Sequence, residues 1–346
     1  MELFVDNWYF LKTPLDTTWE EMEARRQEFQ PVELPHDWLI YNAKNLYEDS
    51  FGWYRKTFPW KCKTGERVIL RFDGVYMNST VYCNGVSIFD WKYGYSTFDV
   101  DLTEQLKDGD NELVVLVRHQ SPNSRWYSGA GIYRNVWLKQ CKETYLPLDG
   151  TYVHIVPADS GLDTTKKLPA DTDFVMHLET EVGGNVTEDT KVVYTLLGPE
   201  GSSRALGEKT CNALCNGKVC LDAEVTAPLL WSTDAPNCYT LQVELQRGSQ
   251  TWDSQRITVG FKTMAFDADK GFFLNGEWLK LHGVCEHHDL GCLGSAFNEA
   301  ALRRQFTILK EMGVNSLRTS HNMPAPEFME LADRMGFLVD SEAFDM

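Results

Sequence analysis

The 346-residue chain lacks any long hydrophobic run and any excess of positive charge. No stretch approaches the roughly 18 apolar residues that a membrane helix needs, so the sequence predicts no membrane-spanning helix. The formal net charge of −17 disfavours a nucleic-acid partner, because phosphate binding requires clustered Lys and Arg side chains. The start, MELFVDNWYF, has no basic segment followed by an apolar stretch, so we expect no signal peptide and a cytoplasmic location.

Paired cysteine motifs are also missing. The nine cysteines are odd in number and scattered, which fits a reducing compartment with free thiols better than a disulfide scaffold. Cys211, Cys215 and Cys220 lie close together, but they have no nearby histidine and no CxxC spacing, which disfavours a metal site.

Two regions of the chain have the pattern of β structure. Residues 1–143 contain short strand-like runs, and Asn84-Gly85 and Asp108-Gly109 are turn signals between them. This spacing predicts an antiparallel sandwich or jelly roll. Residues 144–262 repeat the alternation of apolar and polar residues on a smaller scale, which predicts an immunoglobulin-like sandwich.

From residue 263 to 346 the pattern changes to strands alternating with helices, which is typical of a parallel α/β sheet. The predicted strands are EWLKLHGV (277–284), VNSLR (314–318) and FLVD (337–340). Residues 298–313 and 326–336 are predicted helices. Asn298 can cap the first and Gly313 end it, whereas Pro326 suits the first turn of the second and Gly336 its end.

A polar cluster follows each predicted strand. The clusters are Glu286, His287, His288 and Asp289; Arg318 with Thr319, Ser320, His321 and Asn322; and Glu342 with Asp345. In a parallel α/β barrel the C-terminal strand ends converge on one face, which holds the active site. The three clusters therefore predict a shared polar pocket.

Other interpretations of these residues stay open. A zinc site at Cys285, His287, His288 and Cys292 is disfavoured, because adjacent residues on an extended segment point to opposite sides. Arg318 is as well explained as a buried structural partner of Glu342 on the neighbouring strand as by ligand contact. His282 lies in the middle of a predicted strand and is expected in the core, and His36 is expected to serve packing.

Seven stretches together resemble glycoside hydrolase family 2, in that family's order and from end to end of the chain. They are LPHDW (34–38), GWYRKTF (52–58), RFDGV (71–75), NSRWYSGAGIYRNVWL (123–138), LNGEWLKLHGVCEHHDLG (274–291), MGVNSLRTSHN (312–322) and GFLVDSEAFDM (336–346). The branch is more similar to bacterial β-galactosidases than to β-glucuronidases. The resemblance implies a mainly β, multidomain fold. The expected domains are a jelly-roll sugar-binding domain (1–143), an immunoglobulin-like β-sandwich (144–262) and the first three strands and two helices of a (β/α)8 TIM barrel (263–346).

The resemblance implies roles for individual residues. The family's acid/base and nucleophile are two glutamates that follow roughly the fourth and seventh barrel strands, so we expect no catalytic residue up to Met346 and no activity from this chain alone. Substrate-binding roles carry over to His287, His288, Arg318, His321 and Asn322, and Glu342 matches a residue of the pocket wall. Two positions depart from the family: Ser341-Glu342-Ala343 replaces Asp-Glu-Ala, and His119-Gln120 replaces an Asp-Asn pair that reaches toward the sugar.

The expected protein is thus the N-terminal portion of a retaining, β-galactosidase-like enzyme that binds a β-galactoside-type carbohydrate. We expect no cofactor or metal in this chain, and the resemblance allows a divalent cation or sodium in the full-length enzyme, which is expected to be a homo-oligomer. The alternatives are a non-catalytic carbohydrate-binding module, one part of a split enzyme, and β-glucuronidase-type specificity. Because a three-stranded piece of a barrel has open edges, residues 263–346 are expected either to need another chain or to pack differently from the intact enzyme.

Overall fold

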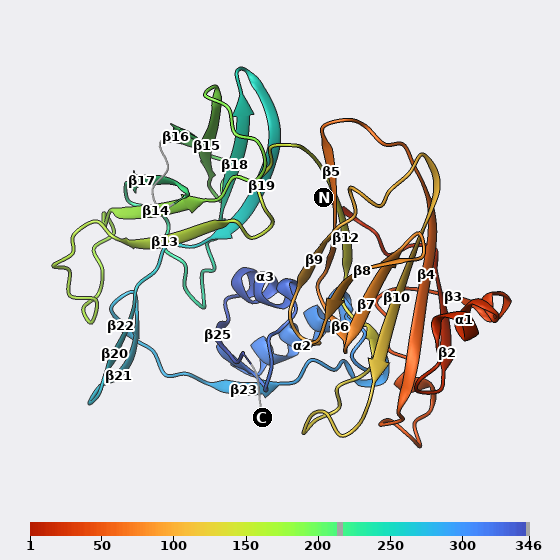
Figure 1. Ribbon diagram of the computed structural model, residues 1–346. Coiled ribbons are helices and arrows are strands. Elements are labelled where there is room, and N and C mark those ends of the chain that lie inside the picture. Colours follow the sequence, from red (N-terminus) through yellow and green to blue (C-terminus); the bar gives the residue numbers. More distant parts are fainter. Residues whose placement is uncertain (213–216, 344–346) are drawn as a thin grey trace.

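The structure is a computed structural model that describes residues 1–212 and 217–343 (Figure 1). Two β-sandwiches lie side by side, and a smaller α/β segment lies beneath and between them (Figure 1). The described helices are all too short or too polar to cross a membrane. Most of its elements are strands, so the fold is mainly β and multidomain, as the sequence predicts.

The first sandwich packs a six-stranded antiparallel sheet, order β3-β2-β4-β10-β7-β8, against a four-stranded sheet, order β1-β12-β5-β9. A two-stranded ribbon, β11-β6, and one short helix accompany them. The elements are β1 (Glu2–Leu3), β2 (Trp8–Thr13), α1 (Trp19–Glu23), β3 (Gln30–Val32), β4 (Ser50–Trp60), β5 (Glu66–Phe72), β6 (Val75–Tyr76), β7 (Ser79–Cys83), β8 (Val86–Trp91), β9 (Phe98–Asp101), β10 (Gly109–His119), β11 (Gly131–Ile132) and β12 (Val136–Lys142).

The core of this sandwich lies between the two sheets. Trp8, Tyr54, Phe72 and Val115 are fully buried there. His36 is buried beside them, with Nδ1 at 2.7 Å from the Tyr54 hydroxyl, so its predicted packing role is confirmed. Burial lowers the pKa of His36 to about 4, which keeps the imidazole neutral in the folded protein near pH 7.

The second sandwich is immunoglobulin-like and consists of a three-stranded sheet, order β13-β14-β17, and a four-stranded sheet, order β16-β15-β18-β19. Its strands are β13 (Thr151–Pro157), β14 (Phe174–Thr180), β15 (Thr190–Leu197), β16 (Ser203–Thr210), β17 (Val219–Val225), β18 (Tyr239–Arg247) and β19 (Gln250–Val259). Buried and partly exposed residues alternate along β15 and β18, because one face of each strand meets the core. This alternation is the pattern that predicted the sandwich.

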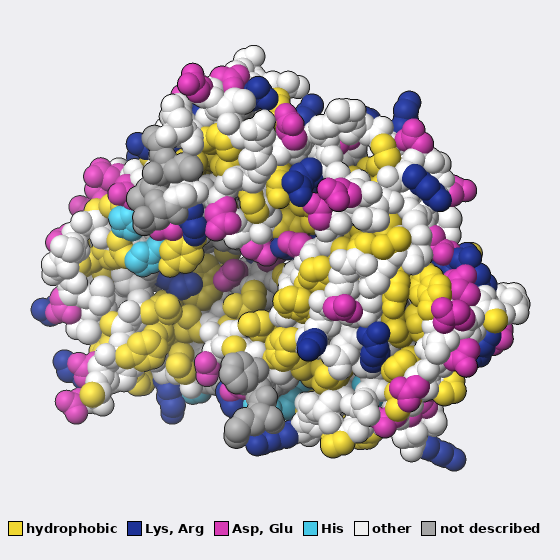
Figure 2. Space-filling model, viewed as in Figure 1, with side chains coloured by type: hydrophobic (Ala, Val, Ile, Leu, Met, Phe, Trp, Pro, Cys, Tyr) yellow, Lys and Arg dark blue, Asp and Glu magenta, His cyan; other side chains and the backbone are white. Residues whose placement is uncertain are grey.

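A small antiparallel sheet follows, with β20 (Met264–Asp267), β21 (Gly271–Leu274) and β22 (Glu277–Trp278). Hydrophobic atoms gather at the lower left of Figure 2, where Figure 1 places this sheet. Phe266 of β20 is 79% exposed. The chain then enters a parallel sheet, order β23-β24-β25, with β23 (Gly283–Glu286), β24 (Ser316–Thr319) and β25 (Leu338–Ser341). This is the predicted start of a barrel. Among the described residues the outer strands β23 and β25 have no further neighbour, and the need for another chain stays a prediction.

The predicted helices both form, as α2 (Glu299–Glu311) and α3 (Pro326–Met335). The side chain of Asn298 accepts a hydrogen bond from the Ala301 amide, which caps the first turn of α2. Pro326 lies in the first turn of α3, and Gly336 ends that helix in the left-handed conformation, at φ +73°.

One strand prediction is wrong. Residues 277–284 do not form a single strand, because β22 pairs with β21 whereas β23 pairs with β24 in a different sheet. His282 lies in the connection between the two sheets. It is therefore exposed rather than buried in a core as predicted.

The α/β segment contacts both sandwiches. On one side, the buried Arg134 of the first sandwich donates from Nη2 to the carbonyl oxygen of Met323 at 2.7 Å. On the other, Trp231 Nε1 donates to the carbonyl oxygen of Asp333 at 2.8 Å, and Lys310 Nζ donates to that of Thr233 at 3.0 Å. Each of the three bodies also has its own hydrophobic cluster. The boundaries at residues 143 and 262 stay predictions.

Candidate functional site

The three predicted polar clusters meet at one edge of the parallel sheet. In the strand register Cys285 lies opposite Arg318, and Arg318 lies opposite Asp340, so the three strands end at the same level. Asp345 lies outside the described residues. Side chains alternate between the two faces of a strand, and the clusters are accordingly divided between an open face and a face toward the helices.

The open face carries an ion pair. Arg318 Nε donates to Glu342 Oε1 at 2.5 Å, and His321 Nδ1 lies 3.0 Å from the other carboxylate oxygen. The Glu342 amide in turn donates to Thr319 Oγ1 at 3.0 Å. The Arg318 side chain is 43% exposed and the Glu342 side chain 24%, so the pair borders solvent. The pairing of Arg318 with Glu342, one of the two interpretations left open, is thus confirmed, but the arginine is not buried as that interpretation expected, and contact with a ligand stays a prediction.

Cys285 lies next to this ion pair on the open face. Arg318 Nη1 is 3.5 Å from its sulfur. Hydrogen bonds with Ser320 and then Arg318 lower the pKa of the Cys285 thiol. Hydrogen bonds with Cys285 and then Glu342 raise the pKa of the Arg318 guanidinium.

His287 and His288 point in different directions, as expected for adjacent residues of an extended segment. The His287 ring stacks on the indole of Trp126, with centroids 4.1 Å apart, and meets His321 edge-on at 5.7 Å. His288 instead packs against Tyr95 and donates from Nε2 to the Ser128 carbonyl oxygen at 3.0 Å. Only His287 therefore lies beside His321; His288 faces the first sandwich.

Burial lowers the pKa of both histidines, that of His288 to about 4. For each, loss of hydration is the largest cause. Both rings are therefore neutral at pH 7, and a neutral imidazole can accept a hydrogen bond as well as donate one.

Two aromatic side chains of the first sandwich reach the strand ends, and sequence reasoning did not single them out. Trp126 Nε1 donates to Asp289 Oδ1 at 2.7 Å. The Tyr93 hydroxyl lies 2.8 Å from the carbonyl oxygen of Ala343 and 3.3 Å from Asn322 Oδ1. The only available signal was the density of aromatic residues in the loop around Trp126.

The positions that replace the family's Asp-Asn pair serve the first sandwich itself. His119 is buried, and its Nδ1 lies 2.8 Å from the Glu48 carbonyl oxygen, while Nε2 lies 3.1 Å from Asn123 Nδ2. Gln120 is exposed. His119 thus makes its hydrogen bonds within this domain, whereas Trp126, Tyr93 and Tyr95 are among the first-domain side chains that contact the strand ends.

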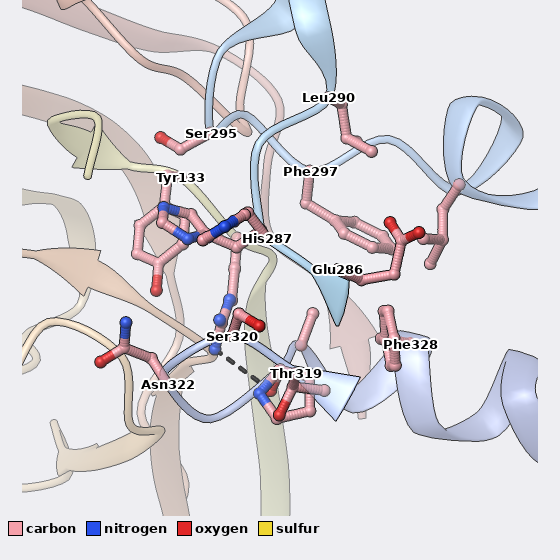
Figure 3. A pocket seen from close by; sticks show the side chains of 15 residues that line it. Tyr133, Glu286, His287, Leu290, Ser295, Phe297, Thr319, Ser320, Asn322 and Phe328 are labelled. Carbon is pink, nitrogen blue, oxygen red and sulfur yellow. Dashed lines mark hydrogen bonds between the residues drawn. The ribbon is translucent and has the colours of Figure 1, made fainter. Parts of the chain in front are cut away.

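A small, partly open cavity of about 40 Å³ lies on the opposite, helix-facing side (Figure 3). Glu286 enters it beside Phe297 and Phe328, and Tyr133 and Asn322 lie across from them (Figure 3). His287 and His288, two of the predicted substrate-binding residues, also line this cavity, whereas Arg318 and His321 do not.

Glu286 differs from Glu342 in environment. Gln305 Nε2 donates to its Oε2 at 2.5 Å, and burial, followed by the charge of Asp289, raises its pKa to about 7. Because it faces α2, Glu286 does not share the open face with Glu342.

The described residues contain no group of three or more His, Cys, Asp or Glu side chains arranged to hold a metal ion. The zinc site that the sequence disfavours does not form, because the side chains of His287 and His288 point in different directions. Cys215, a member of the other cysteine cluster, lies outside the described residues.

Three models of one family match the chain in order. They are the sugar binding domain of glycosyl hydrolases family 2 at residues 15–141, the glycosyl hydrolases family 2 model at 153–262, and the family's TIM barrel domain at 267–344. Beta-galactosidase BoGH2A of Bacteroides ovatus is 42% identical over 334 residues, which are 92% of this chain and 38% of that protein. A putative beta-glucuronidase of Formosa agariphila is 32% identical over 355 residues, which are 99% of this chain and 33% of that protein.

Solved structures agree with these matches. A beta-glycosidase from Bacteroides vulgatus superimposes with a TM-score of 0.85 at 32% identity, over 99% of this chain and 44% of that one. A glycosyl hydrolase family 2 member from Bacteroides cellulosilyticus superimposes with a TM-score of 0.86 at 30% identity, over 100% of this chain and 46% of that one. The chain thus spans less than half the length of these relatives. The order of the three matched domains and the shared fold show that the chain belongs to glycoside hydrolase family 2.

Proposed function

We propose that this chain supplies the N-terminal, sugar-recognising part of a retaining glycosidase that hydrolyses β-galactosides. The observation that carries the proposal is the row of polar side chains on the open face of the sheet, from Arg318 through Glu342 to His321. Such a row offers both donors and acceptors, as the hydroxyl groups of a neutral sugar require.

The carboxyl groups described at the strand ends favour recognition over bond cleavage. Retaining hydrolysis requires two carboxyl groups about 5–5.5 Å apart across the scissile bond. Glu342 is bound by Arg318 and lies near His321, and Glu286 faces α2 with Gln305. Neither is free on the open face to act as one of such a pair. We therefore propose that this chain alone has no hydrolytic activity.

The charge of the site favours a galactoside over a glucuronide. A glucuronide carries a carboxylate, which an unpaired arginine would bind by charge-assisted hydrogen bonds. Here the charge of Arg318 is balanced by Glu342. Glucuronidase specificity is the second candidate, because a relative with 32% identity is a putative beta-glucuronidase.

The test has a catalytic and a binding arm. The purified chain is assayed on the nitrophenyl β-galactoside, β-glucuronide and β-mannoside, with the expected result of no turnover above a buffer blank. Binding of methyl β-galactoside is measured by calorimetry in the wild type and in Arg318→Ala and His321→Ala, and both variants should bind more weakly. Turnover that Glu342→Gln abolishes would contradict the proposal.

Two alternatives have their own outcomes. Galactoside binding that survives both substitutions would favour a carbohydrate-binding module in the first sandwich. Turnover that appears only after mixing with a second polypeptide would favour a split enzyme. Homo-oligomerisation of the full-length enzyme and a cytoplasmic location stay predictions.

A further inference from the structure

We infer that Trp126, on a loop of the first sandwich, is a positioning residue for His287 at the end of the first parallel strand. In this role the indole fixes the plane of the imidazole at the strand ends. The geometric part of the inference stands by itself, and only its consequence for sugar binding rests on the proposed function.

The stacking geometry carries the first step. The rings of Trp126 and His287 are 14° from parallel, with centroids 4.1 Å apart, and the indole covers one imidazole face. His321 meets the same imidazole edge-on, at 5.7 Å and 79°. Aromatic rings in this arrangement attract beyond the area they bury. His287 is therefore held between one side chain of the first sandwich and one of the α/β segment.

The hydrogen bonding of His287 leaves one ring nitrogen without a restraint. A functional imidazole is commonly oriented by a hydrogen bond to one of its two nitrogens. Nδ1 of His287 is buried and has no hydrogen-bond partner among the described residues, and a hydrogen bond with the Ser320 backbone acts on the same ring. The stack on Trp126 adds a restraint on the plane of the ring to that contact.

Trp126 is itself held in place. Its Nε1 donates to Asp289, two residues beyond His287 in the chain, so the indole is bound at its edge as well as along its face. Trp126 is 47% exposed, so the indole lies at the surface and is held by the stack on His287 and by this hydrogen bond rather than by burial in a core.

A buried carboxylate fixes the loops that carry both rings. Asp37 Oδ2 accepts from the Tyr127 hydroxyl at 2.5 Å and from the Ser295 amide at 3.0 Å, and Oδ1 accepts from the Ala130 amide at 3.0 Å. Tyr127 adjoins Trp126, and Ser295 lies in the loop that follows His288. The same side chain therefore ties the indole's loop to the loop beyond the imidazole.

Nuclear magnetic resonance of the whole chain, labelled with ¹³C at histidine, tests the positioning role directly. The chain has eight histidines, and His287→Gln assigns the signals of His287. In the wild type the His287 ring protons should be shifted upfield by the ring current of the indole. In Trp126→Ala this shift should disappear, and the pKa of His287 should rise toward its ordinary value because the ring becomes hydrated.

Two further variants keep this test interpretable. Trp126→Phe retains an aromatic ring but cannot bond Asp289, so it should keep part of the upfield shift even if Trp126→Ala folds poorly. Trp278 is a matched control, because it is 60% exposed and its Nε1 donates to a carbonyl oxygen, that of Lys270, without contacting a histidine. Trp278→Ala should leave the His287 signals unchanged. Unchanged His287 shifts and titration in Trp126→Ala would overturn the inference.

Calorimetry with methyl β-galactoside tests the consequence for binding. If His287 contacts the sugar, Trp126→Ala should weaken binding about tenfold, and Trp278→Ala should not change it. Displacement of His287 with unchanged galactoside affinity would overturn the role in recognition. The two proposals can also fail separately. If the wild-type chain binds no galactoside but Trp126→Ala still changes the His287 signals, the proposed function is wrong and the positioning role is retained.

Discussion

Arg318 and Glu342 form an ion pair across the ends of two neighbouring parallel strands, with Nε donating to Oε1 at 2.5 Å. The second carboxylate oxygen lies 3.0 Å from His321 Nδ1. The arginine therefore reaches the open face with its charge already balanced, and that balance decides which sugars the site would favour.

Neutralising Glu342 should shift the preference of the site toward anionic sugars. In Glu342→Gln the charge of Arg318 is unpaired, and affinity for methyl β-glucuronide relative to methyl β-galactoside should rise about fivefold at low ionic strength. Titration calorimetry with the two ligands measures the ratio. Glu330→Gln is the control, since Glu330 is also paired with an arginine, Arg334, but lies on α3. An equal shift in both variants would argue for a general effect of net charge instead.

Removing the Asp37 carboxylate should strongly destabilise the fold. Asp37 is 1% exposed and accepts hydrogen bonds from the amides of Leu39, Ala130 and Ser295 and from two hydroxyls. Asp37→Ala would leave several of these donors buried without a partner, at a cost of about 3 kcal/mol or more in the free energy of unfolding. Urea denaturation followed by tryptophan fluorescence measures the loss.

The matched control for Asp37 is Asp222→Ala. Asp222 accepts a hydrogen bond from His177, but its side chain is exposed, so the change should stay within about 0.5 kcal/mol. Similar losses in the two variants would contradict the importance given to burial at Asp37.

Gly129→Ala should be more harmful than the same substitution at another left-handed glycine. A Cβ at Gly129, where φ is +69°, would lie 1.9 Å from Ser295 Oγ and 2.6 Å from Asp37 Oδ2. Gly85 has φ +80° and no atom within 4 Å of the added Cβ. Gly85→Ala should therefore cost about 1 kcal/mol from backbone strain alone, and Gly129→Ala roughly 2 kcal/mol more from the clash. Thermal unfolding of the pair separates the two effects, and equal costs would mean that the loop moves to accommodate the methyl group.

Glu286→Gln should stabilise the protein at pH 8 and have little effect at pH 5. Burial raises the folded-state pKa of Glu286 to about 7, so at pH 8 the folded protein must hold a buried carboxylate. As pH falls through 7 the folded state takes up a proton that the unfolded state does not yet bind, and the cost disappears toward pH 4.5. The gain at pH 8 should reach at most about 3 kcal/mol.

The measurement is urea unfolding at the two pH values, again with Glu330→Gln as the control for an exposed carboxylate. A gain of the same size at pH 5 and pH 8 would show that Glu286 is not protonated in the folded state near pH 7.

Local sequence signals predicted much of this structure, because the forces behind them are local. Asn298 caps α2 and Gly336 ends α3, and both interactions span only a few residues. The divergence of His287 and His288 also follows from a local rule, the alternation of side chains along an extended segment. The prediction for His282 failed because one apolar run was assigned to a single strand, although the chain changes sheets within it.

The contacts between domains could not be predicted in this way. Trp126 meets Asp289 163 residues away, and Asp37 meets Ser295 258 residues away. No periodicity or spacing links such positions, since the contacts depend on how whole domains pack. The family resemblance implied the domains and their order, and it singled out His119 and Gln120 in the first domain, whereas Trp126 and Tyr93 are among the side chains that make the contacts.

Three hydrogen bonds between the α/β segment and the two sandwiches join a donor side chain to a main-chain oxygen. Arg134 and Trp231 donate to the carbonyl oxygens of Met323 and Asp333, and Lys310 to that of Thr233. Every residue type presents the same carbonyl group. The accepting positions are therefore free to drift during evolution as long as the backbone path is kept, while the three donors are not. A homologous α/β segment could therefore change residue type at Met323 and Asp333 and keep these two hydrogen bonds, whereas the side-chain bond between Asp289 and Trp126 depends on residue type at both ends.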